Sequence, residues 1–209
     1  MHTLAQFTEE LPGVEDIHRY FGATLDDYYR LANEDTRVEL IDGVLTMHSP
    51  ASFRHERVFL FLASLAEAYA SQKKLGVIAG SRAAVAIDDD RRVEPDIVFL
   101  KTEHQNRIGE VSIEGQVDWI VEILSPATRD YDLGDKRRIY EDAGIPELWF
   151  VDLAQSRVLI ERPAGRRISE VQTGRANCEA LAGFWIESDW LWQSDVPNVY
   201  DCLNQILKG

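Results

Sequence analysis

The segment "VDWIVEILSPATRDYDLGDKRRIYEDAG", residues 117–144, contains an apolar run followed by an amphipathic one, and each run carries a charge where charge is unfavourable. Residues 118–124 are predicted to form a buried strand, because strands covered on both faces are nearly continuous apolar runs. Side chains alternate along a strand, so Glu122 shares a face with Ile120 and Leu124. An isolated carboxylate in an apolar interior must become neutral, pair with a cation or bind a metal.

The second half of the segment, after the turn "SPAT", has helical spacing. The predicted inward stripe consists of Leu133, Lys136, Ile139, Tyr140 and Ala143. Lys136 is the one charge in that stripe. Because the helix directly follows the strand that carries Glu122, its inner face should pack on the sheet and bring Lys136 back toward the carboxylate.

A second buried strand is predicted upstream at "PDIVFL", residues 95–100, in which Asp96 precedes the apolar run and shares a face with Val98. If the two strands are neighbours, Asp96 and Glu122 converge on one divalent cation, because carboxylate oxygens are ligands that suit magnesium. Two acids and a lysine around a metal form an arrangement that cleaves phosphodiesters. The alternative is a buried ion pair between Glu122 and Lys136 without a metal.

The remaining patterns predict an α/β protein with a sheet and covering helices. Helices are expected at 24–33, after Thr24, and at 52–74, with a hairpin around Asp42-Gly43. The predicted sheet strands are 76–80, 83–87, 95–100, 118–124, 147–153 and 157–161. One or two outer strands and a helix near 198–207 should follow, whereas 101–116 is expected to be a loop. We expect one domain spanning residues 1–209, with its core at about 24–190.

The composition restricts the class of protein. The net charge of −14 counts against nonspecific binding of nucleic acid, which requires lysine and arginine at the phosphates. The N-terminal residues lack the pattern of a targeting signal, and no apolar run is long enough to span a bilayer. Cys178 and Cys202 lack the spacing of a metal or redox motif and are expected to be free thiols in a reducing cytoplasm.

Four stretches together resemble a known family: "VELIDGVL", "SPASFRHERV", "PDIVFL" and "VEILSPATRDYDLGDKRRIYEDAGIPELWFVD". They are similar to the putative restriction endonuclease family, a bacterial branch of the PD-(D/E)XK nuclease superfamily. The resemblance covers roughly residues 24–190 and is most specific at 118–152. It implies a restriction-endonuclease-like α/β core, in which helices flank a central mixed β-sheet.

The resemblance also assigns roles to residues. The aspartate of the family falls on Asp96 and its second carboxylate on Glu122. The superfamily usually has a lysine two residues after the glutamate, but Leu124 occupies that position here. The resemblance implies that a lysine from the next helix substitutes for it, and in this chain that residue is Lys136.

Two further positions match the family. The upstream glutamate that can complete the metal site corresponds to Glu39 in "VELIDG". His55 matches a recurrent histidine at the start of the long helix, with no role assigned to it.

The expected function is that of a Mg²⁺-dependent DNA endonuclease, with Mn²⁺ as an alternative metal. Asp96, Glu122 and the backbone carbonyl of Ile123 would hold the metal, and Lys136 would stabilise the attacking hydroxide. A homodimer is expected by analogy, with exposed tryptophans near the C-terminus as its interface. The second hypothesis is a non-catalytic or regulatory protein that keeps the nuclease-like fold, with Glu122 and Lys136 as a structural ion pair.

Overall fold

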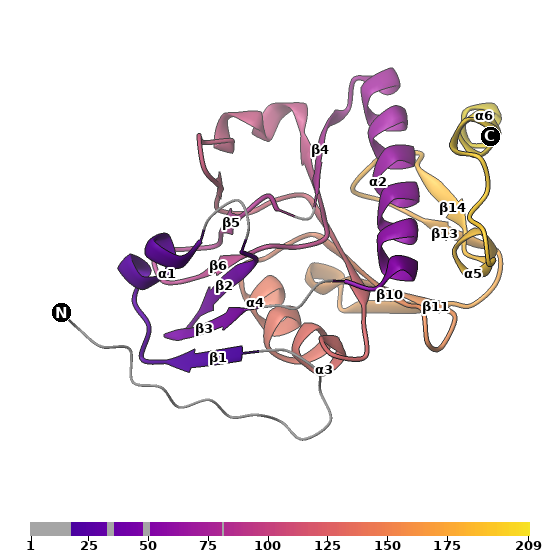
Figure 1. The fold of residues 1–209 in the computed structure, drawn as a ribbon. Helices are drawn as coiled ribbons and strands as arrows, with labels where there is room; N and C mark the ends of the chain where they lie inside the picture. Colours follow the sequence, from indigo (N-terminus) through magenta and orange to yellow (C-terminus); the bar gives the residue numbers. More distant parts are fainter. Residues whose placement is uncertain (1–17, 33–35, 48–50, 81) are drawn as a thin grey trace.

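The computed structural model describes residues 18–32, 36–47, 51–80 and 82–209. Within these ranges the chain forms two six-stranded sheets and a separate pair of strands (Figure 1). The N-terminal leader, the end of the first predicted helix at Asn33 and the start of "SPASFRHERV" lie outside the described residues.

The central sheet has the strand order β12-β11-β10-β9-β7-β4. Its strands are β4 (Gly76–Gly80), β7 (Ile97–Lys101), β9 (Trp119–Leu124), β10 (Glu147–Asp152), β11 (Arg157–Arg162) and β12 (Arg167–Val171). The neighbours β9 and β10 are parallel, and the other pairs are antiparallel. The predicted mixed sheet is therefore confirmed.

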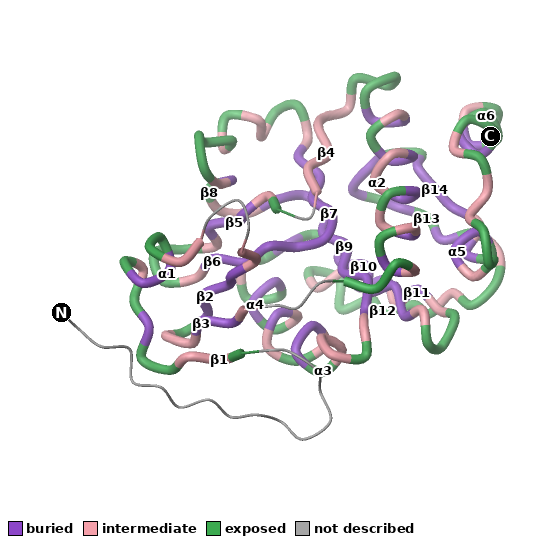
Figure 2. Tube along the Cα trace, in the orientation of Figure 1, coloured by how far each residue is buried: buried purple, intermediate pink, exposed green. Residues whose placement is uncertain are grey.

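Both faces of the central sheet are covered, as the apolar runs predicted. The long helix α2 (Phe53–Lys73) lies over one face, where Val58 and Leu62 pack with Trp119 and Val121 of β9. Ser52 caps this helix through its side chain, which accepts from the backbone N–H of His55. Figure 2 shows the central strands buried between the layers.

The C-terminal part of the chain extends the layer of α2. It consists of β13 (Arg175–Asn177), β14 (Trp185–Glu187), α5 (Asp189–Trp192) and α6 (Val199–Lys208). Trp185 and Trp190 are buried in the same core as α2, and Trp192 packs against it partly buried, so the expectation that these tryptophans are exposed is wrong. Cys178 and Cys202 are buried free thiols.

The second sheet, together with a helical segment, covers the opposite face of the central sheet. Its strand order is β1-β3-β2-β6-β5-β8. The strands are β1 (His18–Phe21), β2 (Val38–Ile41), β3 (Val44–Met47), β5 (Val85–Ala86), β6 (Arg92–Val93) and β8 (Ile113–Glu114), and α1 (Leu25–Leu31) packs on them. Asp42 and Gly43 both have positive φ, as the predicted two-residue hairpin turn requires.

One strand assignment from the sequence is wrong. The stretch 83–87 was expected in the central sheet, but its paired residues, β5, join the second sheet, where Val85 lies opposite Val93 and Ile113. An apolar run indicates that a strand is buried, but it does not indicate which strand it pairs with. The chain passes to the central sheet between β6 and β7, through Pro95, which has no N–H to donate to a ladder.

The predicted loop 101–116 and the predicted helix after "SPAT" both contain more structure than expected. The loop includes a short 3₁₀ helix, Thr102–Arg107, and strand β8. The helix consists of α3 (Arg129–Tyr131), a π-helical turn at Asp132–Lys136 and α4 (Arg137–Asp142). Such π-turns are rare and occur frequently at functional sites. No helix within the described ranges is long and apolar enough to cross a membrane.

Candidate active site

The pairing of β7 with β9 brings two carboxylates together. The strands are antiparallel with Ile97 opposite Val121, so the next pair in the same register is Asp96 and Glu122. The backbone N–H of Ile123 donates to Asp96 Oδ2 over 2.8 Å and holds the aspartate against β9. Both carboxylates are buried. The two strands are thus neighbours, as the convergence of these acids requires.

The ammonium of Lys136 lies among the acidic side chains. Its Nζ is 2.6 Å from Glu122 Oε1 and 3.0 Å from Glu39 Oε1. Asp132 Oδ1 lies 3.7 Å from the same nitrogen. Lys136 is only 1% exposed, so these carboxylates take the place of water around it. Leu124 is buried in the apolar core, and the ammonium from the helical segment reaches the glutamate instead.

Glu39 enters the cluster from the second sheet. It lies in β2 and is fully buried. Its Oε1 accepts a 2.8 Å hydrogen bond from the backbone N–H of Glu94, in the connection from β6 to β7, and also faces Lys136. The cluster therefore lies between the two sheets.

Arg37 and His55 also contact Asp96. Arg37 Nη2 is 3.3 Å from Asp96 Oδ1 and donates to the backbone carbonyl of Glu94 over 2.6 Å. His55, in the first turn of α2, places Nε2 3.2 Å from Asp96 Oδ2. His55 therefore belongs to the cluster. Arg37 had no signal in the sequence, because a single arginine before a strand is an ordinary surface pattern.

Two more side chains reach the cluster from the helical segment. The hydroxyl of Tyr140 donates to Glu122 Oε1 over 2.6 Å. Asp132 lies beside Lys136, as described above, and is buried. Asp132 is four residues before Lys136 in the sequence, and Tyr140 is four residues after it. Tyr140 belongs to the inward stripe that the sequence predicts, where it had no role, and Asp132 could have been found by the same spacing, since residues four apart share a helix face.

The two central acids have opposite electrostatic environments. Burial raises the pKa of Glu122 to about 8, although Lys136 acts in the other direction. Burial acts on Asp96 in the same sense, but the hydrogen bond from His55 and the charge of Arg37 outweigh it and hold the pKa of Asp96 at about 2. Asp96 is therefore charged at neutral pH, whereas the charge of Glu122 is opposed by burial and by the neighbouring acids and is favoured by Lys136.

The cluster contains more acids than fixed cations. The buried acids are Glu39, Asp96, Glu122 and Asp132. Among the described residues, Lys136 and Arg37 form ion pairs with these acids, and His55 contacts Asp96. Buried acids gathered this closely favour the uptake of protons or of a further cation.

Glu122 Oε2 and Asp96 Oδ1 accept no hydrogen bond from the described residues. The hydrogen bond and the ion pair that Glu122 makes with described residues both go to Oε1. Asp96 Oδ1 is buried and has no hydrogen-bond partner among them, although it faces Arg37. Magnesium commonly uses one or two carboxylates and completes its shell with water. The two carboxylates are thus oxygen ligands of the kind that a hard divalent cation takes, and the expected third ligand, the carbonyl of Ile123, belongs to β9.

A complete metal site built from side chains alone is not present in the described residues. None of their His, Cys, Asp and Glu side chains form a group of three or more that could hold a metal ion. A cation at this cluster would thus depend on two carboxylates, a backbone carbonyl and water.

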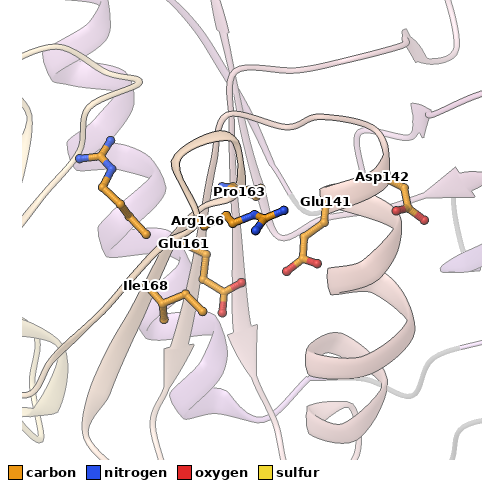
Figure 3. Close-up of a pocket in the computed structure, with 7 residues that line it drawn as sticks. Glu141, Asp142, Glu161, Pro163, Arg166 and Ile168 are labelled. Carbon is orange, nitrogen blue, oxygen red and sulfur yellow. The ribbon is translucent and has the colours of Figure 1, made fainter.

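A pocket of about 370 Å³ lies on the outer side of α4 and is separate from the cluster (Figure 3). Its lining residues are Glu141, Asp142, Glu161, Pro163, Arg166, Arg167 and Ile168. Two of its charged residues are paired, since Arg137 Nε lies 2.8 Å from Glu161 and Arg167 donates twice to Glu179. The pocket shares no residue with the cluster around Glu122.

The mixed sheet with helices on both faces is a restriction-endonuclease-like α/β core. The chain belongs to the family described as "Putative restriction endonuclease" (Uma2), which matches residues 25–189. It is similar to a solved structure described as "a putative nuclease belonging to DUF820 from Anabaena variabilis ATCC 29413". The TM-score is 0.70 at 18% identity, over 81% of this chain and 97% of that chain. A search of curated proteins gives no match. The family and fold class inferred from the sequence are confirmed.

Proposed function

We propose that the protein is a metal-dependent endonuclease that hydrolyses phosphodiester bonds of DNA at the cluster around Glu122. The observation that carries the proposal is the register of β7 and β9, which sets Asp96 beside Glu122, with Lys136 Nζ 2.6 Å from the glutamate. Membership of the family described as "Putative restriction endonuclease" supports a nucleic acid as the substrate.

Each residue of the cluster would have a distinct task. A bound Mg²⁺, or Mn²⁺ in its place, would supply an acidified water and positive charge at the scissile phosphate. The carboxylates of Asp96 and Glu122 and the carbonyl of Ile123 would bind it. Lys136 would orient the attacking water and offset the negative charge that develops on the phosphate. Glu39 would keep the ammonium of Lys136 in place.

The charge of the protein affects how DNA would bind. A net charge of −14 repels a polyanion, so productive binding would be favoured by the divalent ion at the cluster and by local arginines such as Arg37. A homodimer is part of the proposal, because two such clusters would serve the two strands of a duplex. Sedimentation of the purified chain measures that assembly.

Asp96→Asn is expected to reduce Mg²⁺-dependent cleavage of supercoiled plasmid roughly 10³-fold, because loss of a metal ligand removes several kcal/mol of transition-state stabilisation. Chelation of the metal by EDTA should have the same effect on the unaltered protein. The measurement is the rate of nicking and linearisation on gels, in Mg²⁺ and in Mn²⁺.

Asp118→Asn is the matched control for this substitution. Asp118 is also buried and precedes β9 at its other end, where it accepts from the backbone N–H of Lys101 and contacts His104. Asp118→Asn should cleave like the unaltered protein once both samples are corrected for folded fraction. Equal loss of cleavage in the two variants would count against the assigned site.

The second candidate function is that of a non-catalytic or regulatory protein that keeps this fold. The contacts of Lys136 with Glu122 and Glu39 favour it, because they partly neutralise the acids without a metal. This candidate predicts no metal-dependent cleavage above the level of Asp96→Asn on supercoiled, linear or single-stranded DNA. Cleavage of any one of these substrates that Asp96→Asn abolishes would exclude it.

A further inference from the structure

Tyr140 is a buried residue that has no part in the proposed reaction. It lies on α4, its side chain is fully buried, and its hydroxyl is 2.6 Å from Glu122 Oε1. Lys136, one helical turn earlier, approaches the same oxygen at the same distance. The two donors therefore reach the glutamate from one helix face and contact the same oxygen atom.

Tyr140 and Lys136 contact the same oxygen of Glu122, and this orients its carboxylate. Because Oε1 of Glu122 receives the phenol and the ammonium, Oε2 is the oxygen that stays open. In Asp96, Oδ2 accepts from the N–H of Ile123 and contacts His55, while Oδ1 makes no hydrogen bond in the described chain and lies 3.3 Å from Arg37 Nη2. Glu122 thus offers Oε2, and Asp96 offers Oδ1 beside the guanidinium of Arg37.

Lys136 alone would not fix the orientation of Glu122. Its ammonium also lies 3.0 Å from Glu39, so it can be shared between the two glutamates. A phenol on a rigid ring has one proton to donate and few rotamers. The hydroxyl of Tyr140 donates that proton to Glu122 Oε1 over 2.6 Å.

We propose that Tyr140 is a positioning residue, whose hydroxyl holds Glu122 by Oε1 and thereby presents Oε2 to a divalent cation shared with Asp96. The inference rests on the proposed function, because it assumes that the cluster binds a metal. It adds one requirement to the proposed function. The affinity for the metal would depend on Tyr140, whose side chain does not contact the metal.

The test compares Tyr140→Phe with Tyr69→Phe in the full chain. Tyr69 is a buried tyrosine on α2, and its hydroxyl donates to the backbone carbonyl of Ala182 over 3.1 Å, on the opposite side of the central sheet. Both variants lose one buried hydroxyl and keep the ring. Binding of Mn²⁺ is measured by calorimetric titration and by the electron paramagnetic resonance signal of the free ion.

Tyr140→Phe should bind Mn²⁺ about 10-fold more weakly, since loss of a hydrogen-bond partner of a metal ligand lowers affinity by that order. Its kcat should fall while its KM for DNA stays unchanged. Tyr69→Phe should bind Mn²⁺ like the unaltered protein. If Tyr140→Phe is only partly folded, the rise in Tm caused by Mn²⁺, measured against its own metal-free sample, gives the same comparison.

Two outcomes overturn the inference in distinguishable ways. If Tyr140→Phe binds Mn²⁺ within twofold of the unaltered protein, Tyr140 is a structural residue only, and the proposed function stands. If the unaltered protein binds no Mn²⁺, the metal-dependent function and the role of Tyr140 both fail.

Discussion

Lys136→Met is expected to abolish metal-dependent cleavage and to lower the free energy of unfolding by about 3–5 kcal/mol, the usual effect of removing one partner of a buried ion pair. The methionine would fill much of the volume of the lysine but leave Glu122 and Glu39 without their ammonium. Urea unfolding measures the stability, and plasmid nicking measures the activity.

A double-substitution cycle separates the two roles of Lys136. Glu122→Gln combined with Lys136→Met removes both charges of the 2.6 Å pair, so the double variant should be more stable than Lys136→Met alone. It should still not cleave DNA, because both the carboxylate and the ammonium are missing. Recovery of cleavage in the double variant would contradict the proposed site.

Arg138→Met serves as the control on the same helix. Arg138 lies on α4 with its side chain 63% exposed, and its contact with Asp135 is a surface one. Its substitution should change the free energy of unfolding by at most about 0.5 kcal/mol. A loss as large as that of Lys136→Met would show that the effect comes from the helix and not from the buried charge.

Glu147→Ala is expected to destabilise the protein by about 3–5 kcal/mol without changing the affinity for Mn²⁺ or the cleavage by the folded fraction. Glu147 is buried at the start of β10, where Oε1 accepts from Trp149 Nε1 and Arg162 Nη2. Its Oε2 accepts from the backbone N–H groups of Glu179 and Ala180. The substitution would leave Trp149 Nε1 and the two backbone N–H groups without this acceptor, whereas Arg162 Nη2 keeps the backbone carbonyl of Asn177.

The position of Glu147 explains why its loss should not affect the site. It lies opposite Trp119 in the parallel ladder and shares the sheet face that packs on α2, whereas Glu122 points to the other face. Unfolding in urea measures the destabilisation, and Mn²⁺ titration of the folded variant checks the site. A weaker Mn²⁺ affinity would show that the two faces are coupled.

The sequence predicted the parts of the site that depend on local periodicity. Alternation along 118–124 put Glu122 on the face of Ile120, and helical spacing put Lys136 on the inward stripe, both as the structure has them. The resemblance supplied Glu39, which the structure brings to Lys136. These positions follow from the side-chain periods of strands and helices, which any single sequence displays.

The parts that the sequence missed depend on which segments meet in space. The stretch 83–87 has the apolar character of a core strand, but tertiary contacts assign it to the second sheet. Arg37 enters the site because β2 lies beside the connection that leads to Asp96. The π-turn at 132–136 contains no unusual residue, so the helical spacing of the sequence did not indicate the turn.

The location of the cluster between the two sheets affects when it can form. Its acids and its lysine come from β2, the start of β7, β9 and the helical segment, so chain from residue 39 to residue 140 must be folded around it. Contacts so distant in sequence form late, after the entropy of loop closure has been overcome. A ribosome-bound chain that ends before residue 140 has no assembled cluster, so the hydrolytic activity proposed for the cluster cannot precede the meeting of the two sheets.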